Sequence, residues 1–137
     1  MTKITIGALA LVGGLLLSPH DTEAQKLNAQ IYELRVYHTN PGLLKNLHAR
    51  FQEHTSHLFV KHGMSLIGYW VPADEDNTLI YILAFPSAEA REKAWTAFSE
   101  DPEWQKVRDA SHEEAGGPIV DKIDSTIMFP TEYSPIR

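Results

Sequence analysis

The sequence contains no cysteine, which excludes disulfide bridges, iron–sulfur centres, thiol nucleophiles and a c-type haem attachment. It has no cluster of basic residues, and its net charge at pH 7 is −6. Nucleic acid and anionic membrane surfaces are therefore not expected partners. The GxSxG, Walker and dinucleotide-binding motifs are also missing, which disfavours a serine nucleophile and nucleotide binding. A fold without disulfides must depend on packing alone.

Hydrophobic runs of membrane-spanning length are missing as well. The apolar run Ile4–Leu17 falls short of the ~20 residues that a membrane-spanning helix needs, and an A-x-A-like site ending at Ala24 follows it. We interpret residues 1–24 as a secretory signal peptide and residues 25–137 as one domain. The protein is then exported, periplasmic or secreted, and has no stable membrane insertion after cleavage. An uncleaved anchor is the alternative, and an intact mass beginning at Gln25 distinguishes the two.

The pattern after the leader begins with a strand and a long helix. Residues 31–37 are rich in β-branched and aromatic types and alternate in character, which predicts a strand. The helix that follows is expected to have Asn40 as its N-cap, Pro41 in its first turn and Gly63 just beyond its end.

The second half of the chain repeats the alternation. Apolar runs at 64–72 and 77–86, separated by the turn-rich ADEDN, predict a hairpin. A helix capped by Ser87, a short helical piece from Asp101 and a last strand near 119–128 complete the order βαββαβ. This order predicts an α+β, ferredoxin-like domain with a four-stranded antiparallel sheet and helices on one face.

The two hairpin strands are apolar on both of their faces. Helices on one side of the sheet leave the other side without a cover, and no further segment of the chain is long enough to supply one. A second copy of the same sheet is therefore expected, packed face to face in a homodimeric α/β barrel.

Four stretches together resemble the NIPSNAP family over Gln30 to Pro135. They are YELRVYHTNPGLLKNLHARF, HGMSLIGYW, DPEW and IMFPTEYSP. The resemblance implies a dimeric α/β barrel and supplies no catalytic residues. Barrels related to this family include cofactor-free monooxygenases of polyketide biosynthesis, haem-degrading oxygenases and small isomerases, so the fold alone selects no reaction.

Four histidines lie in HARFQEHTSHLFVKHG, and helical geometry separates them. At 100° per residue, His54 falls on the apolar stripe of Leu43, Leu47, Phe51 and Leu58, whereas His48, His57 and His62 lie beside it or toward solvent. His54 is therefore either a core histidine or the candidate catalytic group. Because no third ligand accompanies His54 and His57, no metal site is expected.

Six residues are candidates for ligand binding in a cavity between helix and sheet. The aromatic ones are suited to an apolar or aromatic ligand, and ordinary core packing is the alternative. Glu33 and Arg35 share one strand face, where an ion pair at the dimer interface is favoured over an anion-binding role. The six candidates are Tyr32, Arg35, His54, Trp70, Tyr81 and Trp95.

Two functions remain open from the sequence. The first is a homodimer that binds a small molecule or a protein partner. The second is an enzyme, a cofactor-independent or haem-linked monooxygenase with His54 and Trp70 near the reacting atoms. No cofactor is expected, apart from haem if His54 serves as its axial ligand.

Overall fold

A computed structural model describes residues 29–136 of the chain, and the expected leader lies outside these residues. The elements follow the order βαββαβ, as the sequence predicts. They are β1 (Ile31–Thr39), α2 (Leu44–Arg50), η1 (Phe51–Thr55), α3 (Ser56–Lys61), β2 (Ser65–Trp70), β3 (Thr78–Phe85), α4 (Ala88–Glu100), α5 (Pro102–Ala115) and β4 (Val120–Met128).

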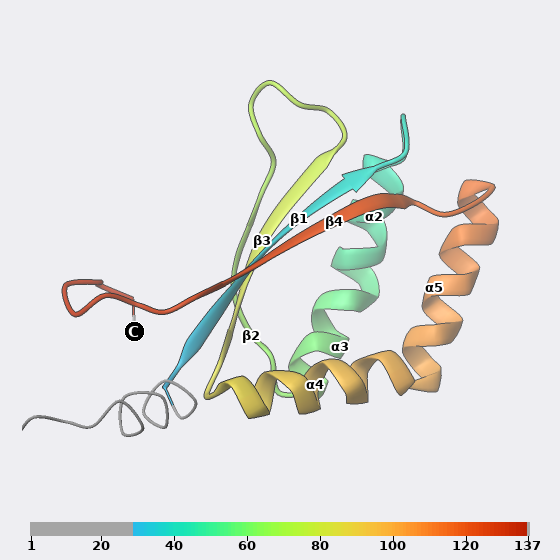
Figure 1. The fold of residues 1–137 in the computed structure, drawn as a ribbon. Coiled ribbons are helices and arrows are strands. Elements are labelled where there is room, and N and C mark those ends of the chain that lie inside the picture. Colours follow the sequence, from blue (N-terminus) through green and yellow to red (C-terminus); the bar gives the residue numbers. More distant parts are fainter. Residues whose placement is uncertain (1–28, 137) are drawn as a thin grey trace, which may run out of the picture.

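The four strands form one antiparallel sheet in the order β2-β3-β1-β4 (Figure 1). The pairing of β1 with β3 places Arg35 opposite Tyr81, and the pairing of β1 with β4 places it opposite Ser125. This strand order and the helix placement confirm the ferredoxin-like, α+β prediction.

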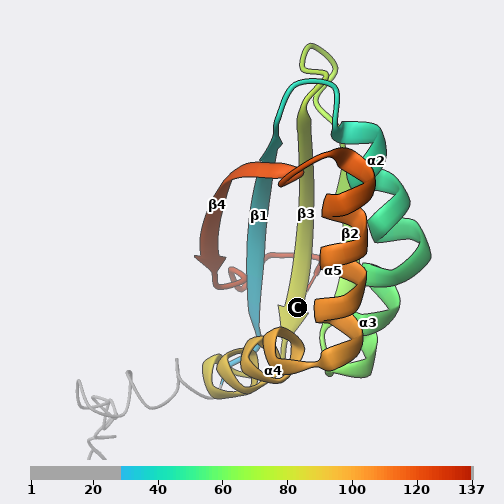
Figure 2. The same cartoon turned by 90° about the vertical axis from the view of Figure 1, so that its right-hand side faces the viewer.

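The helices cover one face of this sheet (Figure 2). Helices α2, α3 and α5 stand on one side, and α4 runs across one end of the strands. The core between the two layers is rich in aromatic rings in edge-to-face contact, and Phe51 lies 5.3 Å from Tyr81 between ring centroids. The largest fully buried side chains include Tyr81, Phe59 and Phe85.

The first helical segment begins later than predicted. Its N-cap is Leu43, so Asn40 and Pro41 precede the helix instead of capping and starting it. The side-chain amide of Asn40 donates to the carbonyl oxygen of Pro118 at 2.8 Å. Gly42, with φ of 78°, lies in the turn that precedes α2. At the other end Gly63, with φ of 80°, follows α3 as predicted.

The same segment contains a π-helical turn, η1, between α2 and α3. A π-turn holds more residues than an α-turn, so it rotates the residues within it relative to a regular helix. Thr55 is thereby buried, and its hydroxyl donates to the carbonyl oxygen of Arg50 at 3.2 Å. His54, which a regular helix would turn toward the sheet, points outward.

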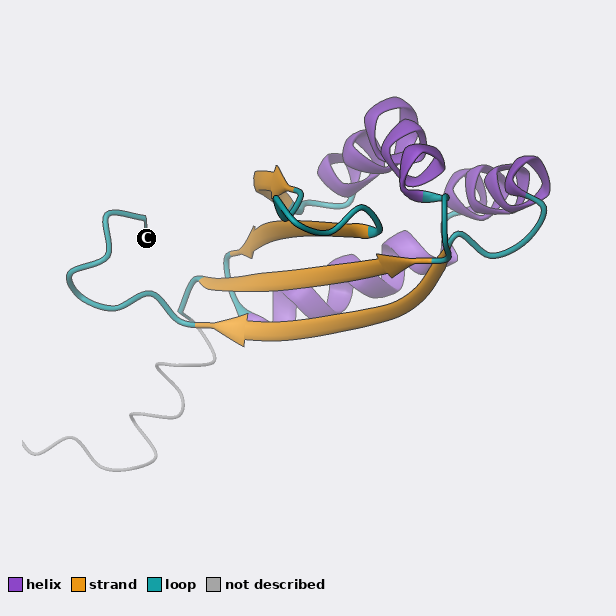
Figure 3. Ribbon diagram, turned by 90° about the horizontal axis from the view of Figure 1, so that it is seen from above, coloured by secondary structure: helices purple, strands orange, loops and turns teal. Residues whose placement is uncertain are grey.

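The face of the sheet opposite the helices, which we call the open face, is largely apolar. Its central part carries half-buried Leu34, Val36, Ile80 and Ile82. Trp70 of β2 is 50% exposed, and its ring lies against Gly68. The C-terminal segment leaves the end of β4 away from the helices (Figures 1 and 3).

That segment covers only one end of the open face. A hollow of about 290 Å³ lies between it and Tyr32, Ile67 and Ile82. Tyr32 is buried there, whereas Ile67 and Trp70 remain exposed. No helix among residues 29–136 has the length and apolar character needed to cross a membrane.

Candidate ligand-binding site

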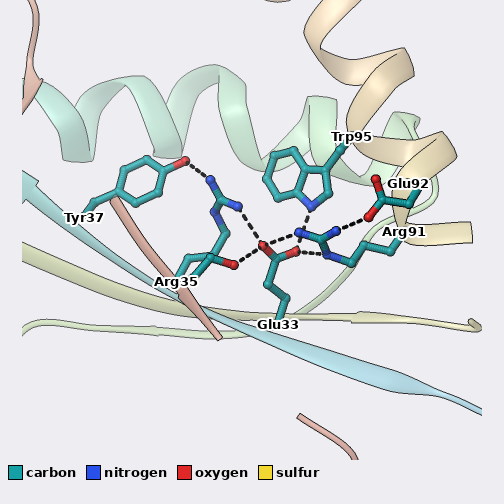
Figure 4. Close-up of polar contacts among 7 residues, drawn as sticks. Glu33, Arg35, Tyr37, Arg91, Glu92 and Trp95 are labelled. Carbon is teal, nitrogen blue, oxygen red and sulfur yellow. Dashed lines mark hydrogen bonds and ion pairs between the residues drawn. The ribbon is translucent and has the colours of Figure 1, made fainter. Parts of the chain in front are cut away.

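The polar centre of the helix-covered face is the carboxylate of Glu33 (Figure 4). This side chain is fully buried, and four residues donate hydrogen bonds to it. The donors are Arg35 at 2.7 Å, Arg91 at 2.7 and 3.0 Å, the Trp95 indole at 2.7 Å and the Ser125 hydroxyl at 2.7 Å. Burial acts to raise the pKa of Glu33, but these hydrogen bonds lower it to about 2.

The Glu33 network also fixes the position of Arg35. The guanidinium lies 4.3 Å from the Trp95 ring centre, and it donates to the Tyr37 hydroxyl at 3.4 Å. The ion pair predicted between Glu33 and Arg35 is therefore present. Its predicted place at a dimer interface is wrong, because both side chains lie beneath the helices, where α4 supplies their further partners.

Tyr81 lies beside this network at the centre of the core. Its side chain is fully buried, and its hydroxyl has no hydrogen-bond partner among the described residues. Burial raises the pKa of Tyr81 well above its ordinary value, so the phenol stays protonated. Tyr37, whose ring centre is 5.2 Å away, stands next to it.

Arg50 brings a third guanidinium to the helix-covered face, from the end of α2. The residue is only 6% exposed, and its nearest polar contacts are Ser111 at 3.2 Å and His112 at 3.5 Å. Its Nε has no hydrogen-bond partner, and no carboxylate of residues 29–136 forms an ion pair with it. Burial lowers the pKa of Arg50, because it disfavours the charged form.

A cavity of about 200 Å³ lies next to Arg50, between the helices and the sheet. Ile123 of β4 lines it and is 45% exposed, so the cavity reaches solvent beside β4. Its lining is aromatic and basic and includes no carboxylate. The members are Tyr37, Arg50, Phe51, Thr55, Phe59, Phe98, Trp104, Arg108, His112, Val120 and Ile123.

His112 is the one histidine of this lining. Its Nε2 accepts from the Arg50 guanidinium, since an arginine can only donate. Burial and the charges of Arg50 and Arg108 lower the pKa of His112. The imidazole is therefore neutral at pH 7.

The structure divides the six residues predicted to bind a ligand into three places. Arg35, Tyr81 and Trp95 lie together on the helix-covered face, but none of them lines the cavity of about 200 Å³ beside Arg50. Tyr32 and Trp70 lie on the open face, so the sheet separates them from the other three. His54 contacts neither group.

His54 was predicted to face the sheet, and that prediction is wrong. Its side chain is 51% exposed, and it lines a groove of about 420 Å³ on the outer side between the first helical segment and α5. The π-turn that buries Thr55 is the physical reason. No group of three metal-ligating side chains that could hold an ion occurs in the described part of the chain.

His62, and not His54, is the histidine of the first helical segment that is largely buried and bonded to another element. His62, predicted to be peripheral, is only 15% exposed in its side chain and lies 2.7 Å from Asp101. Asp101 accepts from the backbone NH of Glu103 and so caps α5, which is longer than the short piece expected. Hydrogen bonds from Lys61 and His62 hold the pKa of Asp101 well below its usual range.

We therefore expect His54→Ala to change the free energy of unfolding by no more than ~0.5 kcal/mol, as is usual for exposed positions. His62→Ala should lower the urea midpoint more, because it removes one partner of the residue that caps α5. Equal losses in the two variants would contradict the outward position of His54.

Sequence reasoning missed Arg50, Arg108 and His112. Arg50 could have been found from the sequence. It follows Leu43 by seven residues, which at 100° per residue places the two side chains about 20° apart around the helix axis, so Arg50 lies at the edge of the apolar stripe. Arg108 and His112 belong to a helix whose length was underestimated, and they had no such signal.

Comparison with known proteins agrees with the fold. The NIPSNAP family model matches residues 32–135. A NIPSNAP-like domain protein from Burkholderia xenovorans is 20% identical, with a TM-score of 0.68 over 79% of this chain and 90% of that one. A NIPSNAP family protein of unknown function from Agrobacterium tumefaciens is 21% identical, with a TM-score of 0.69 over 80% and 96%.

A further similar structure is SnoaB from Streptomyces nogalater, described as a cofactor-independent oxygenase. It is 11% identical, with a TM-score of 0.56 over 78% of this chain and 98% of that one. At these identities the structures establish a shared fold alone. No curated protein matches the chain.

Proposed function

The chain belongs to the NIPSNAP family, and from this premise we propose that it is a homodimer in which each chain binds one small aromatic molecule. The observation that carries the proposal is the aromatic-walled cavity that reaches solvent beside β4. Ligand sites are typically concave, mostly apolar and supplied with a few placed polar groups. This cavity has that composition.

The size of the cavity limits the ligand. Its volume of about 200 Å³ is below the ~300–1,000 Å³ that is typical of sites for drug-sized molecules. A single aromatic ring with a short substituent suits it. The walls are held in place by ring contacts, such as Phe98 with Trp104 at 4.5 Å and Phe98 with Phe59 at 4.9 Å.

The homodimer is proposed on the open face. Leu34, Val36 and Ile80 form an apolar surface that neither the helices nor the C-terminal segment covers, and Ile82 lies at its edge beside that segment. An apolar sheet face of this kind marks an interaction surface. A second copy related by a two-fold axis brings an identical apolar face against it, so the apolar surfaces of both chains are removed from water at once.

A variant at the mouth of the cavity tests the binding proposal. Ile123→Trp fills the mouth and should weaken the binding of benzyl alcohol at least tenfold, measured by NMR titration. Ile127→Trp is the matched control, because Ile127 lies on the same strand and face, is 41% exposed and does not line the cavity. Equal affinity in the two variants would contradict the proposed site.

An oxygenase is the second candidate, and His112 favours it. The Nε2 of the neutral imidazole can accept a proton from an acidic phenol or enol if it gives up its 3.5 Å hydrogen bond from Arg50, and the Arg50 guanidinium then stabilises the resulting anion. Molecular oxygen would then be the oxidant. Oxygen consumption with an acidic phenol or enol that is lost in His112→Ala would support this function. If the wild-type protein consumes no oxygen with such substrates, the oxygenase function is contradicted and ligand binding is the remaining function.

A further inference from the structure

We infer that the cavity selects an anionic ligand, a carboxylate on a single aromatic ring, and that the Arg50 guanidinium is the group that binds it. This inference rests on the proposed binding function and adds the charge and chemical class of the ligand. It depends on three observations: the buried charge of Arg50, the donors that its guanidinium leaves free, and the other groups of the lining.

Arg50 is a buried cation without a counter-ion in the described chain. Its residue is 6% exposed, and its contacts are a hydroxyl, a neutral imidazole and the Trp104 ring at 5.3 Å. A buried charge costs free energy unless a partner of opposite sign compensates it. The other buried charges of the described part, Glu33 and Asp101, both have cationic partners.

The unused edge of Arg50 has the geometry that a carboxylate needs. Ser111 and His112 both contact Nη1, whereas Nε is buried without a partner. In a planar guanidinium, Nε and the other terminal nitrogen present two parallel N–H donors. A carboxylate accepts such a pair of hydrogen bonds in a bidentate manner.

The surrounding charges favour the same ligand. Arg108 lines the cavity, and its side chain is 42% exposed where it pairs with Asp109. The cavity lining carries no Asp or Glu, although the whole chain has a net charge of −6. The charged residues of this lining are therefore all cationic, while the rings of Phe51, Phe98 and Trp104 supply the apolar part of the site.

Titrations with benzoate and with neutral benzyl alcohol test the inference. Wild-type protein should bind benzoate at least tenfold more tightly. Arg50→Gln should remove this preference, while Lys45→Gln, which removes a positive charge from an exposed position on the same helix, should keep it. If Arg50→Gln does not fold, Arg108→Gln replaces it and should reduce the preference.

The outcomes separate the inference from the function on which it rests. Equal affinity for the two probes, or unchanged benzoate affinity in Arg50→Gln, would overturn the carboxylate assignment and leave the binding function intact. Failure of both probes to bind would overturn the binding function itself.

A second measurement needs no variant. The charged and titratable neighbours of His112 come from three elements. They are Arg50 of α2, Tyr37 of β1, and Arg108 and Asp109 of its own helix, α5. A bound benzoate would offset the cationic charges and raise the pKa of His112, which NMR can follow. An unchanged His112 titration at saturating benzoate would contradict the assignment.

Discussion

Glu33→Gln is expected to lower the free energy of unfolding by about 3–5 kcal/mol, the usual cost of removing one partner from a buried ionic network. The carboxylate is fully buried and neutralises two arginines, Arg35 and Arg91. A neutral amide would leave both guanidinium groups without their buried counter-ion. It would also turn its NH₂ group toward donors such as the Trp95 indole, where no acceptor is available.

The effect should depend on pH in a defined direction. The pKa of Glu33 is about 2 in the folded protein, below its ordinary value of 4.5. A group with a lowered pKa stabilises the fold fully above its ordinary pKa and loses this contribution as the pH falls toward the folded value. The difference between wild type and Glu33→Gln should therefore be largest near neutral pH and shrink between pH 4.5 and pH 2.

Glu92→Gln is the matched control in urea denaturation. Glu92 pairs with the same Arg91, but its side chain is 73% exposed. Exposed ion pairs contribute ~0–1 kcal/mol, so this variant should remain close to wild type. Similar losses in the two variants, or a difference that does not change with pH, would show that Glu33 does not anchor the helix-covered face.

Leu34→Glu is expected to convert the proposed dimer into a monomer. Leu34 lies on the central strand β1, on the open face, opposite Ile82 and Thr126. The new carboxylate stays hydrated in a single chain, whereas the two-fold interface would bury two of them at a cost of several kcal/mol each. Since ~1.4 kcal/mol is a factor of ten, the dissociation constant should rise at least ~1,000-fold.

Ala97→Glu adds the same charge at an exposed position of α4 and should leave association unchanged. Analytical ultracentrifugation of the two variants and wild type measures the effect. A wild-type protein that is monomeric at micromolar concentration, or a Leu34→Glu variant that associates as tightly as wild type, would contradict the proposed interface.

The fold was largely predictable because its signals are local. The alternation of β1, the hairpin around residues 73–77 and the Ser87 cap each depend on neighbouring residues. The start of the first helical segment, the π-turn within it and the length of α5 were not predicted correctly. At the first of these, the turn containing Gly42 and the bond from Asn40 to Pro118 replaced a simple N-cap.

The site was less predictable, because its geometry depends on a feature without a local signal. The projection that placed His54 inward assumed a regular helix, and the π-turn of η1 invalidated it. The partners of Arg50 lie about sixty residues away on α5, so its lack of a counter-ion emerges only from tertiary structure. By contrast, the pairing of Glu33 with Arg35 followed from their spacing on one strand.

Native mass spectrometry of the protein with excess benzoate tests the central claim most directly. We expect a species of two chains that carries two benzoate molecules, and an Ile123→Trp dimer that carries none under the same conditions. A single chain as the main species, or two chains that retain no benzoate, would contradict the proposal of a homodimer with one small-molecule site in each chain.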